Sequence, residues 1–150
     1  MSNTSFDLSG KAAIVTGGNG GIGLGIARGL AQAGANIVVA ARNQQKTDSA
    51  LEELRGLGVI AIGVPTEVTD EGDVANMVRA TMDEFGRVDI LVNNAGGSPP
   101  RPALTMSEGF FERAFRFNVT QAMLLMQRCV PRMLETSGHG SIVNISSRAA

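Results

Sequence analysis

The sequence has no tyrosine and no tryptophan, and it has one cysteine and one histidine among its 150 residues. The lone cysteine, Cys129, excludes an internal disulfide framework, and its apolar helical surroundings predict a buried structural thiol. The lone histidine, His139, stands between two glycines and lacks the serine and carboxylate context of a hydrolase triad. A disulfide scaffold and a triad hydrolase are therefore not predicted.

An excess of charge of either sign is also missing, because 13 basic and 14 acidic side chains leave a net charge of −1. Without a basic bias there is no electrostatic footprint for nucleic acid or for an anionic membrane. No apolar run approaches the ~20 residues of a membrane span, and residues 1–8 lack a signal-peptide layout. We expect no nucleic-acid or membrane partner, no metal site and a cytoplasmic location.

Apolar residues make up 43% of the sequence, enough for one globular core. Short apolar runs predict buried strands at residues 12–15, 36–41, 59–64, 88–92 and 141–146. Helices are predicted at residues 22–33, 44–57, 70–85 and 107–135, the last of them open to a break near Pro131. Because strands and helices alternate, we expect one α/β domain over residues 1–150, with a doubly wound parallel sheet that stops after its fifth strand.

The most informative motif is Thr16-Gly17-x-x-x-Gly21-x-Gly23, which joins the first strand to the first helix. Glycines at these offsets allow a sharp turn and close approach to a pyrophosphate, whose charge the N–H groups of the helix start attract. The alternative is a plain glycine-rich turn; a nucleoside-triphosphate loop is disfavoured because no Gly-Lys-Ser/Thr follows. The residues expected to bind phosphate here are Gly17, Asn19, Gly20, Gly21, Ile22 and Gly23. The helix is expected to pack on the sheet through Ile22, Ile26 and Leu30.

Five residues stand at or just after the carboxyl ends of the five predicted strands: Gly17, Ala41, Glu67, Asn93 and Ser147. Ligands of open α/β sheets bind outside these ends, so the five positions predict one shared site.

The sequence resembles the short-chain dehydrogenase/reductase family over essentially its whole length, and the strand-end positions carry part of this resemblance. Four features occur in that family's order and spacing: Thr16-Gly17-x-x-x-Gly21-x-Gly23, Asn93-Asn94-Ala95-Gly96, Asn118 within Phe117-Asn118-Val119, and Ile142-Val143-Asn144-Ile145-Ser146-Ser147. The resemblance implies a Rossmann fold and an NAD(P)-dependent oxidoreductase that interconverts a secondary alcohol and a ketone by hydride transfer.

The resemblance also implies roles for single residues. Ser147 would hold the substrate oxygen, and Asn118 would hold a water in a proton relay. The backbone of Asn94, Ala95 and Gly96 would line the riboses of the cofactor, and the asparagine pair Asn93-Asn94 would also steady the central strands. From the residues alone two simpler interpretations stay open: Asn118 bonded to a neighbouring backbone carbonyl, and Ser147 as a turn former.

The sequence departs from the family where the acid/base residues belong. In the family a tyrosine, followed after three residues by a lysine, comes soon after the serine. This sequence has no tyrosine, and its only lysines, Lys11 and Lys46, stand far from that position. We therefore expect the natural protein to be longer, and the strand at 141–146 to present an exposed apolar edge.

The cofactor is expected to be NADP rather than NAD. Ala41 occupies the place of the acidic residue that bonds a ribose 2′-hydroxyl, and Arg42 follows it, where a guanidinium can grip a 2′-phosphate. A second basic residue that is frequent in the family is replaced by Gly20. Glu67, followed by Val68, replaces a shorter aspartate near the adenine.

Three hypotheses follow: an oxidoreductase completed by residues outside this sequence, a non-catalytic dinucleotide-binding protein, and an inactive fragment. The substrate class is a small ketone or alcohol whose identity is open. The resemblance implies a homo-oligomer, a tetramer or dimer assembled through the long helix. One apolar stripe on that helix suits either such an interface or the core: Ala122, Leu125, Met126, Cys129 and Met133.

Overall fold

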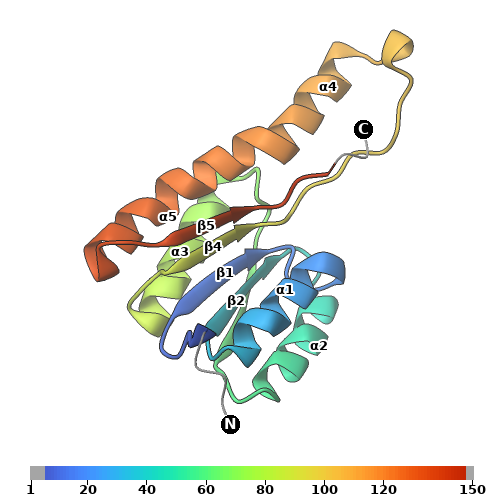
Figure 1. The fold of residues 1–150 in the computed structure, drawn as a ribbon. Coiled ribbons are helices and arrows are strands. Elements are labelled where there is room, and N and C mark those ends of the chain that lie inside the picture. The colour runs from blue at the N-terminus through green and yellow to red at the C-terminus, as the bar shows by residue number, and fades with distance from the viewer. Residues whose placement is uncertain (1–5, 148–150) are drawn as a thin grey trace.

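The structure, a computed structural model, describes residues 6–147, so residues 1–5 and 148–150 of the expected domain lie outside the described residues. Its centre is one parallel sheet with the strand order β3-β2-β1-β4-β5 (Figure 1). The strands are β1 (Ala12–Thr16), β2 (Asn36–Ala41), β3 (Ala61–Pro65), β4 (Ile90–Asn93) and β5 (Ser141–Asn144). The expected doubly wound α/β fold is confirmed. The strand order reverses between β1 and β4, which places the topological switch point there.

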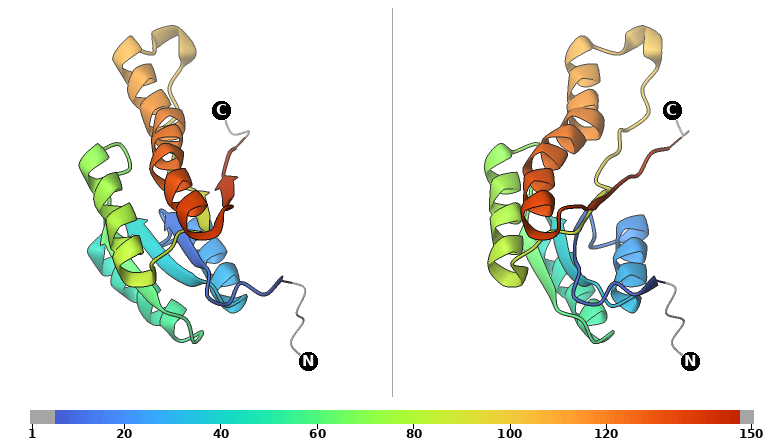
Figure 2. Two further views of the ribbon diagram at one scale, coloured as in Figure 1. Left: turned by 90° about the vertical axis from the view of Figure 1, so that its left-hand side faces the viewer. Right: turned by 60° about the vertical axis from the view of Figure 1, so that its left-hand side comes forward.

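Helices cover both faces of the sheet (Figure 2). One layer holds α1 (Gly21–Gln32) and α2 (Gln44–Arg55). The other holds α3 (Glu71–Phe85) and a long helix made of α4 (Glu108–Phe115), a π-helical segment η3 (Arg116–Thr120) and α5 (Gln121–Ser137). Within residues 6–147 no helix has the length and apolarity to cross a membrane.

Side-chain caps explain where three of these helices begin. The side chains of Asn43, Asp70 and Ser107 accept hydrogen bonds from backbone N–H groups three residues later. Each cap satisfies one donor that the first turn leaves unpaired. Asp70 is thus the cap of α3 and not its first residue.

Strand pairing moves several predicted boundaries. β3 starts at Ala61, where pairing with Ile37 begins, and not at residue 59. β4 starts at Ile90, because pairing with β1 begins there and the Val88-Asp89 stretch precedes it. β5 stops at Asn144, two residues early, where its pairing with Asn93 ends. Ladder hydrogen bonds, which apolar runs do not encode, decide these ends.

The predicted packing face of α1 is wrong in one respect. Ile22 is 69% exposed, whereas the fully buried stripe is Gly23, Ala27 and Ala31. These small residues recur every four positions and let the helix start come close to the strand-end backbone, which a larger side chain would prevent. Ile26 and Leu30 pack beside that stripe and are only partly buried.

The long helix does not break at Pro131, which lies inside α5. The apolar stripe on this helix belongs to the core, because Leu125, Cys129 and Met133 are each at most 2% exposed. Burial raises the pKa of the Cys129 thiol to about 12, so the thiol stays protonated and unreactive, as expected. A different stripe faces outward: Phe111, Phe115, Val119 and Met123.

The fifth strand forms the exposed edge that was expected. Ile142, Val143 and Ile145 are 37%, 44% and 38% exposed, although all three are apolar. Edge strands of this kind offer unpaired backbone groups to a further strand.

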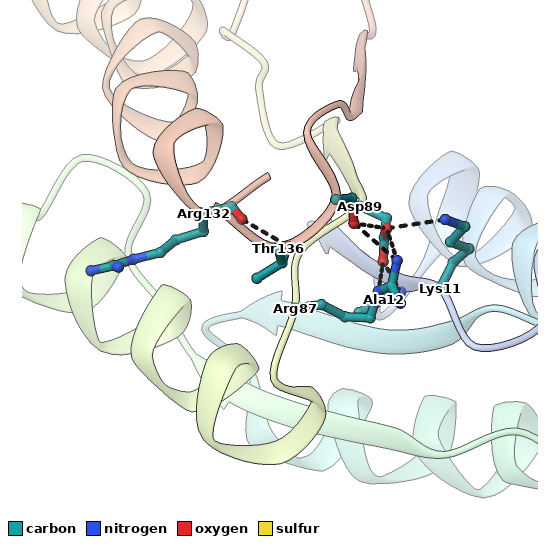
Figure 3. A network of polar contacts seen from close by, with 7 residues as sticks. Lys11, Ala12, Arg87, Asp89, Arg132 and Thr136 are labelled. Atoms are coloured by element: carbon teal, nitrogen blue, oxygen red, sulfur yellow. Dashed lines mark hydrogen bonds and ion pairs between the residues drawn. The ribbon is translucent and has the colours of Figure 1, made fainter. Parts of the chain in front are cut away.

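Asp89 organises a polar cluster at the amino-terminal end of β4, opposite the switch point (Figure 3). Its 5% exposed carboxylate accepts two hydrogen bonds from Arg87, at 2.6 and 2.7 Å, and one from the Ala12 N–H at 2.9 Å. Lys11 and the Ser137 hydroxyl contact the same carboxylate at 3.5 and 3.1 Å. The cluster therefore ties β1, β4 and the end of α5 together.

The Asp89 cluster predicts acid sensitivity. Burial alone would raise the pKa of Asp89, but the hydrogen bonds from Arg87, Ala12 and Ser137 and the Arg87 charge outweigh burial and lower it to about 2 from 3.8. A lowered pKa stabilises the fold above the unfolded value of 3.8, and this contribution is lost as pH falls toward 2. We expect Asp89 to contribute about 2 kcal/mol of unfolding free energy that disappears between about pH 5 and pH 2.

Urea denaturation at a series of pH values measures this contribution. Asp89→Asn should lower stability at neutral pH and flatten the acid limb of the profile. The exposed Asp83 on α3 supplies the matched control, since Asp83→Asn should leave the curve close to that of the unmodified protein. Equal acid limbs for both variants would contradict the assignment.

Candidate functional site

A cleft of about 330 Å³ lies at the carboxyl ends of β1 to β4. Its lining includes eight of the predicted cofactor-binding residues: Gly17, Asn19, Arg42, Glu67, Val68, Asn94, Ala95 and Gly96. Six residues that were not predicted to bind the cofactor also line it: Ala40, Ala41, Asn43, Lys46, Thr66 and Phe117. Of the five strand-end positions, Gly17, Ala41 and Glu67 share this cleft, whereas Asn93 and Ser147 do not line it.

The glycine loop after β1 has a backbone that side chains would not tolerate. Gly17 and Gly21 have φ angles of 63° and 51°, in the left-handed region. At Gly23 an added Cβ would lie 2.2 Å from the Gly17 carbonyl oxygen and 2.5 Å from Nδ2 of Asn94. The start of α1 is therefore packed directly onto the loop and onto Asn94, the first residue after β4.

The Thr16 hydroxyl joins this loop to the segment that follows β4. Its Oγ1 donates to the Val92 carbonyl at 3.3 Å and accepts from the N–H groups of Asn94 and Ala95, both at 3.0 Å. Asn94 returns the contact, since its Nδ2 donates to the Thr16 carbonyl at 2.9 Å. Thr16 was identified only as part of a motif, and the structure makes it the hydrogen-bonding centre of the site.

The helix start beside the loop is open to an anion. Gly20 caps α1 without a side chain, and no acidic residue stands in the first turn, which Gly21, Ile22 and Gly23 form. Asn19 stabilises the loop from the other side, because its Nδ2 donates to the Asn43 carbonyl and to the Thr47 hydroxyl. The first-turn N–H groups and the helix dipole together favour negative charge here.

Arg42 and Glu67 face each other across the far end of the cleft. Nη1 of Arg42 donates to Oε2 of Glu67 at 3.1 Å, while the Arg42 side chain stays 71% exposed. Partial burial would raise the pKa of Glu67, but hydrogen bonds from Thr69 and the Arg42 charge outweigh burial and lower it. Glu67 is therefore ionised at neutral pH, and the exposed guanidinium keeps donors free for a ligand.

Lys46 is a second basic residue at this end of the cleft. It lies in the first turn of α2, where its N–H donates to the capping Asn43 side chain, and it lines the cleft together with Arg42. Sequence reasoning weighed Lys46 only against the catalytic lysine position. Its place three residues after a capping asparagine, just beyond the second strand, is the signal that could have located it here.

Asn118 lies in η3, beside the cleft. Its Oδ1 accepts from the Gly97 N–H at 2.8 Å, and its Nδ2 donates to the carbonyls of Gly97 and Ala114 at 3.1 and 2.8 Å. The simpler interpretation, a bond to a neighbouring helix carbonyl, is thus part of the observed geometry. Because both amide donors are used, the side chain fixes the loop after β4, and its role in a proton relay stays a prediction.

Ser147 is exposed and lies just after the carboxyl end of β5. The Ile145 N–H donates to the Asn93 carbonyl at 3.0 Å, so this segment continues beside the end of β4 (Figure 1). Asn93 itself is 4% exposed and turns its side chain to Asn144, to which it donates at 2.8 Å. Asn93 therefore links two strands, as the resemblance implies for the asparagine pair, and it does not line the cleft.

This geometry fits a dinucleotide. A backbone cradle that excludes a Cβ at Gly23 allows phosphates to approach the first turn of α1. Arg42 and Lys46 add positive charge to the lining of the cleft. The residues that would hold the group are the glycine loop, these two cations and the Asn94 to Gly96 backbone.

Comparisons with known proteins show the family to which the chain belongs. A family model described as short chain dehydrogenase matches residues 11–150. The 7alpha-hydroxysteroid dehydrogenase of Escherichia coli (strain K12) is 39% identical over 150 residues, which is 100% of this chain and 58% of that protein. The L-rhamnose 1-dehydrogenase (NADP(+)) of Thermoplasma acidophilum is 37% identical over 146 residues, covering 97% of this chain and 58% of that protein.

A solved structure is similar over the same extent. It is a 7 alpha-hydroxysteroid dehydrogenase complexed with NADH and 7-oxo glycochenodeoxycholic acid, with a TM-score of 0.92 and 37% identity over 100% of this chain and 58% of that one. The chain belongs to the short-chain dehydrogenase family, and it spans little more than half the length of these relatives.

Proposed function

We propose that the whole protein transfers hydride between NADP and a small secondary alcohol or ketone. The cleft at the switch point carries this proposal, because its glycine cradle, basic end and Asn94 to Gly96 wall together suit a nicotinamide dinucleotide. When bound, the cofactor supplies or accepts the hydride. The family relationship and the oxidoreductase names of the relatives support the same reaction class.

Within this proposal the residues of the chain have distinct tasks. The Ser147 hydroxyl, exposed beyond β5, is proposed to donate a hydrogen bond to the substrate oxygen and so orient it. Asn118 is proposed to serve the proton relay, and its side-chain bonds to Gly97 keep the loop next to it in place. The exposed stripe along the long helix, Phe111, Phe115, Val119 and Met123, supports the proposal of a homo-oligomer assembled through that helix.

The decisive test is a spectrophotometric screen of the complete protein with NADPH and NADH against a panel of ketones. Oxidation of either cofactor that depends on one class of ketone would support the proposal and name the substrate. A complete protein that binds neither cofactor would overturn it. A 7-oxo steroid and a sugar are the first substrates to include, since related proteins carry those substrates in their names.

Cofactor preference gives a sharper prediction. Arg42→Ala should weaken NADPH binding by about ten- to a hundredfold, because hydrogen bonds to a charged partner are worth about 1.5–3 kcal/mol. NADH lacks the 2′-phosphate, so its affinity should change less than about threefold. Fluorescence titration with both cofactors measures the two constants. The exposed Arg79 on α3 lies outside the cleft lining, and Arg79→Ala should change neither affinity.

A further inference from the structure

Gln121, the first residue of α5, is a long polar side chain buried in an otherwise apolar layer. Only 1% of its surface is exposed. Its Nε2 donates to the Ala95 carbonyl at 3.0 Å, and its Oε1 has no hydrogen-bond partner within residues 6–147. A buried acceptor without a partner costs free energy, which an apolar side chain of the same length would avoid. Packing therefore does not explain glutamine at this position, whereas the bond to Ala95 does.

Ala95 lies in the irregular segment that forms one wall of the cleft. Its N–H is held by the Thr16 hydroxyl and its carbonyl by Gln121. Two residues later, both backbone polar groups of Gly97 are held by Asn118. β4 ends at Asn93, and among residues 6–147 the bonds that hold Ala95 and Gly97 come from side chains, which therefore define the path of this segment.

We infer that Gln121 is a positioning residue of the cofactor cleft, acting through the Ala95 carbonyl. The inference rests on the proposed function, since the wall that Gln121 fixes is the one assigned to the dinucleotide. Gln121 and Asn118 are three residues apart in one helix and hold successive backbone groups of the wall. The start of α5 with η3 is thus a two-point clamp on residues 95–97. Without the Gln121 bond the Ala95 peptide is free to rotate. The cleft wall is then no longer preorganised for the ligand, and ordering it on binding costs affinity.

The test uses Gln121→Met, which keeps the length of the side chain and removes both the donor and the unpaired acceptor. We expect its dissociation constant for NADPH to rise about three- to tenfold, the value of one hydrogen bond. Amide exchange over residues 94–98 should become faster by a similar factor in the protein without cofactor. The melting temperature should change little, because removal of the unpaired oxygen offsets the loss of the bond to the Ala95 carbonyl. Gln127→Met makes the same chemical change at an exposed position of α5 and should alter none of the three readouts.

Each result decides the inference. The inference would be overturned if Gln121→Met had the same amide exchange and the same NADPH affinity as Gln127→Met. It would also be overturned if the NADPH affinity of Gln121→Met fell only because the protein had become less stable. If the unmodified protein binds neither NADPH nor NADH, the proposed function fails. The exchange measurement still decides the clamp in that case. Faster amide exchange at residues 94–98 in Gln121→Met supports the clamp, and unchanged exchange overturns it. Gln121→Leu removes the same donor and the same unpaired acceptor, so the same readouts apply if methionine prevents folding.

Discussion

Gly23→Ala is expected to weaken NADPH binding by about a hundredfold or more. The new Cβ would lie 2.2 Å from the Gly17 carbonyl oxygen and 2.5 Å from Nδ2 of Asn94. Neither contact can be relieved by moving a flexible side-chain end, because the first is backbone and the second amide is bonded to the Thr16 carbonyl. The start of α1 must therefore move away from the loop, which opens the phosphate cradle.

Gly25→Ala is the matched control for this substitution. Gly25 lies in the same helix, two residues further on, and nothing stands within 4 Å of its added Cβ. Replacing a helical glycine there should stabilise the protein by about 0.5–1 kcal/mol and leave NADPH binding unchanged. Fluorescence titration of both variants compares the affinities. A Gly23→Ala protein that binds NADPH within about threefold of the unmodified protein would show that the cradle does not hold the cofactor.

Thr16→Val is expected to lower the free energy of unfolding by about 2–4 kcal/mol. Valine has the same shape, so packing is preserved while the hydroxyl is lost. The N–H groups of Asn94 and Ala95 then lose their common acceptor, and each unsatisfied buried donor costs about 1–3 kcal/mol. Thr16 itself is completely buried.

Urea denaturation measures this loss, and the m-value should stay the same. Thr16→Ser supplies the control, because it keeps the hydroxyl and loses one methyl group, at about 1 kcal/mol. Amide exchange at Asn94 and Ala95 should be faster in the valine variant and unchanged in the serine variant. Equal midpoints for the valine and serine variants would mean that the hydroxyl does not join β1 to the segment after β4.

The outward-facing stripe of the long helix shows that apolar spacing alone does not predict burial. One stripe of the long helix, through Leu125, Cys129 and Met133, suited either the core or an interface, and the structure assigns it to the core. The stripe through Phe111 and Phe115 has the same spacing, yet both rings are more than half exposed. Apolar spacing identifies a helix, whereas burial depends on which element packs against it.

The sequence by itself determined the parallel α/β fold, the turn at the glycine loop and the basic residue after the second strand. These features follow from short-range causes: apolar runs, glycines that permit positive φ, and residues that stand directly at strand ends. Family motifs extended the same reasoning to Asn94, Asn118 and Ser147. The sequence did not predict the register in which the strands pair. The observed ends of β3, β4 and β5 therefore differ from the predicted ends by up to two residues.

Only the tertiary structure decided which residues hold the site together. Thr16 bonds a segment 78 residues away, and Gln121 bonds Ala95 across 26 residues. The same holds for Asn93, which turns to a neighbouring strand, and for Lys46, which joins Arg42 in the cleft. Such contacts join residues that no periodicity or spacing relates, because the fold brings them together only after each strand and helix has packed.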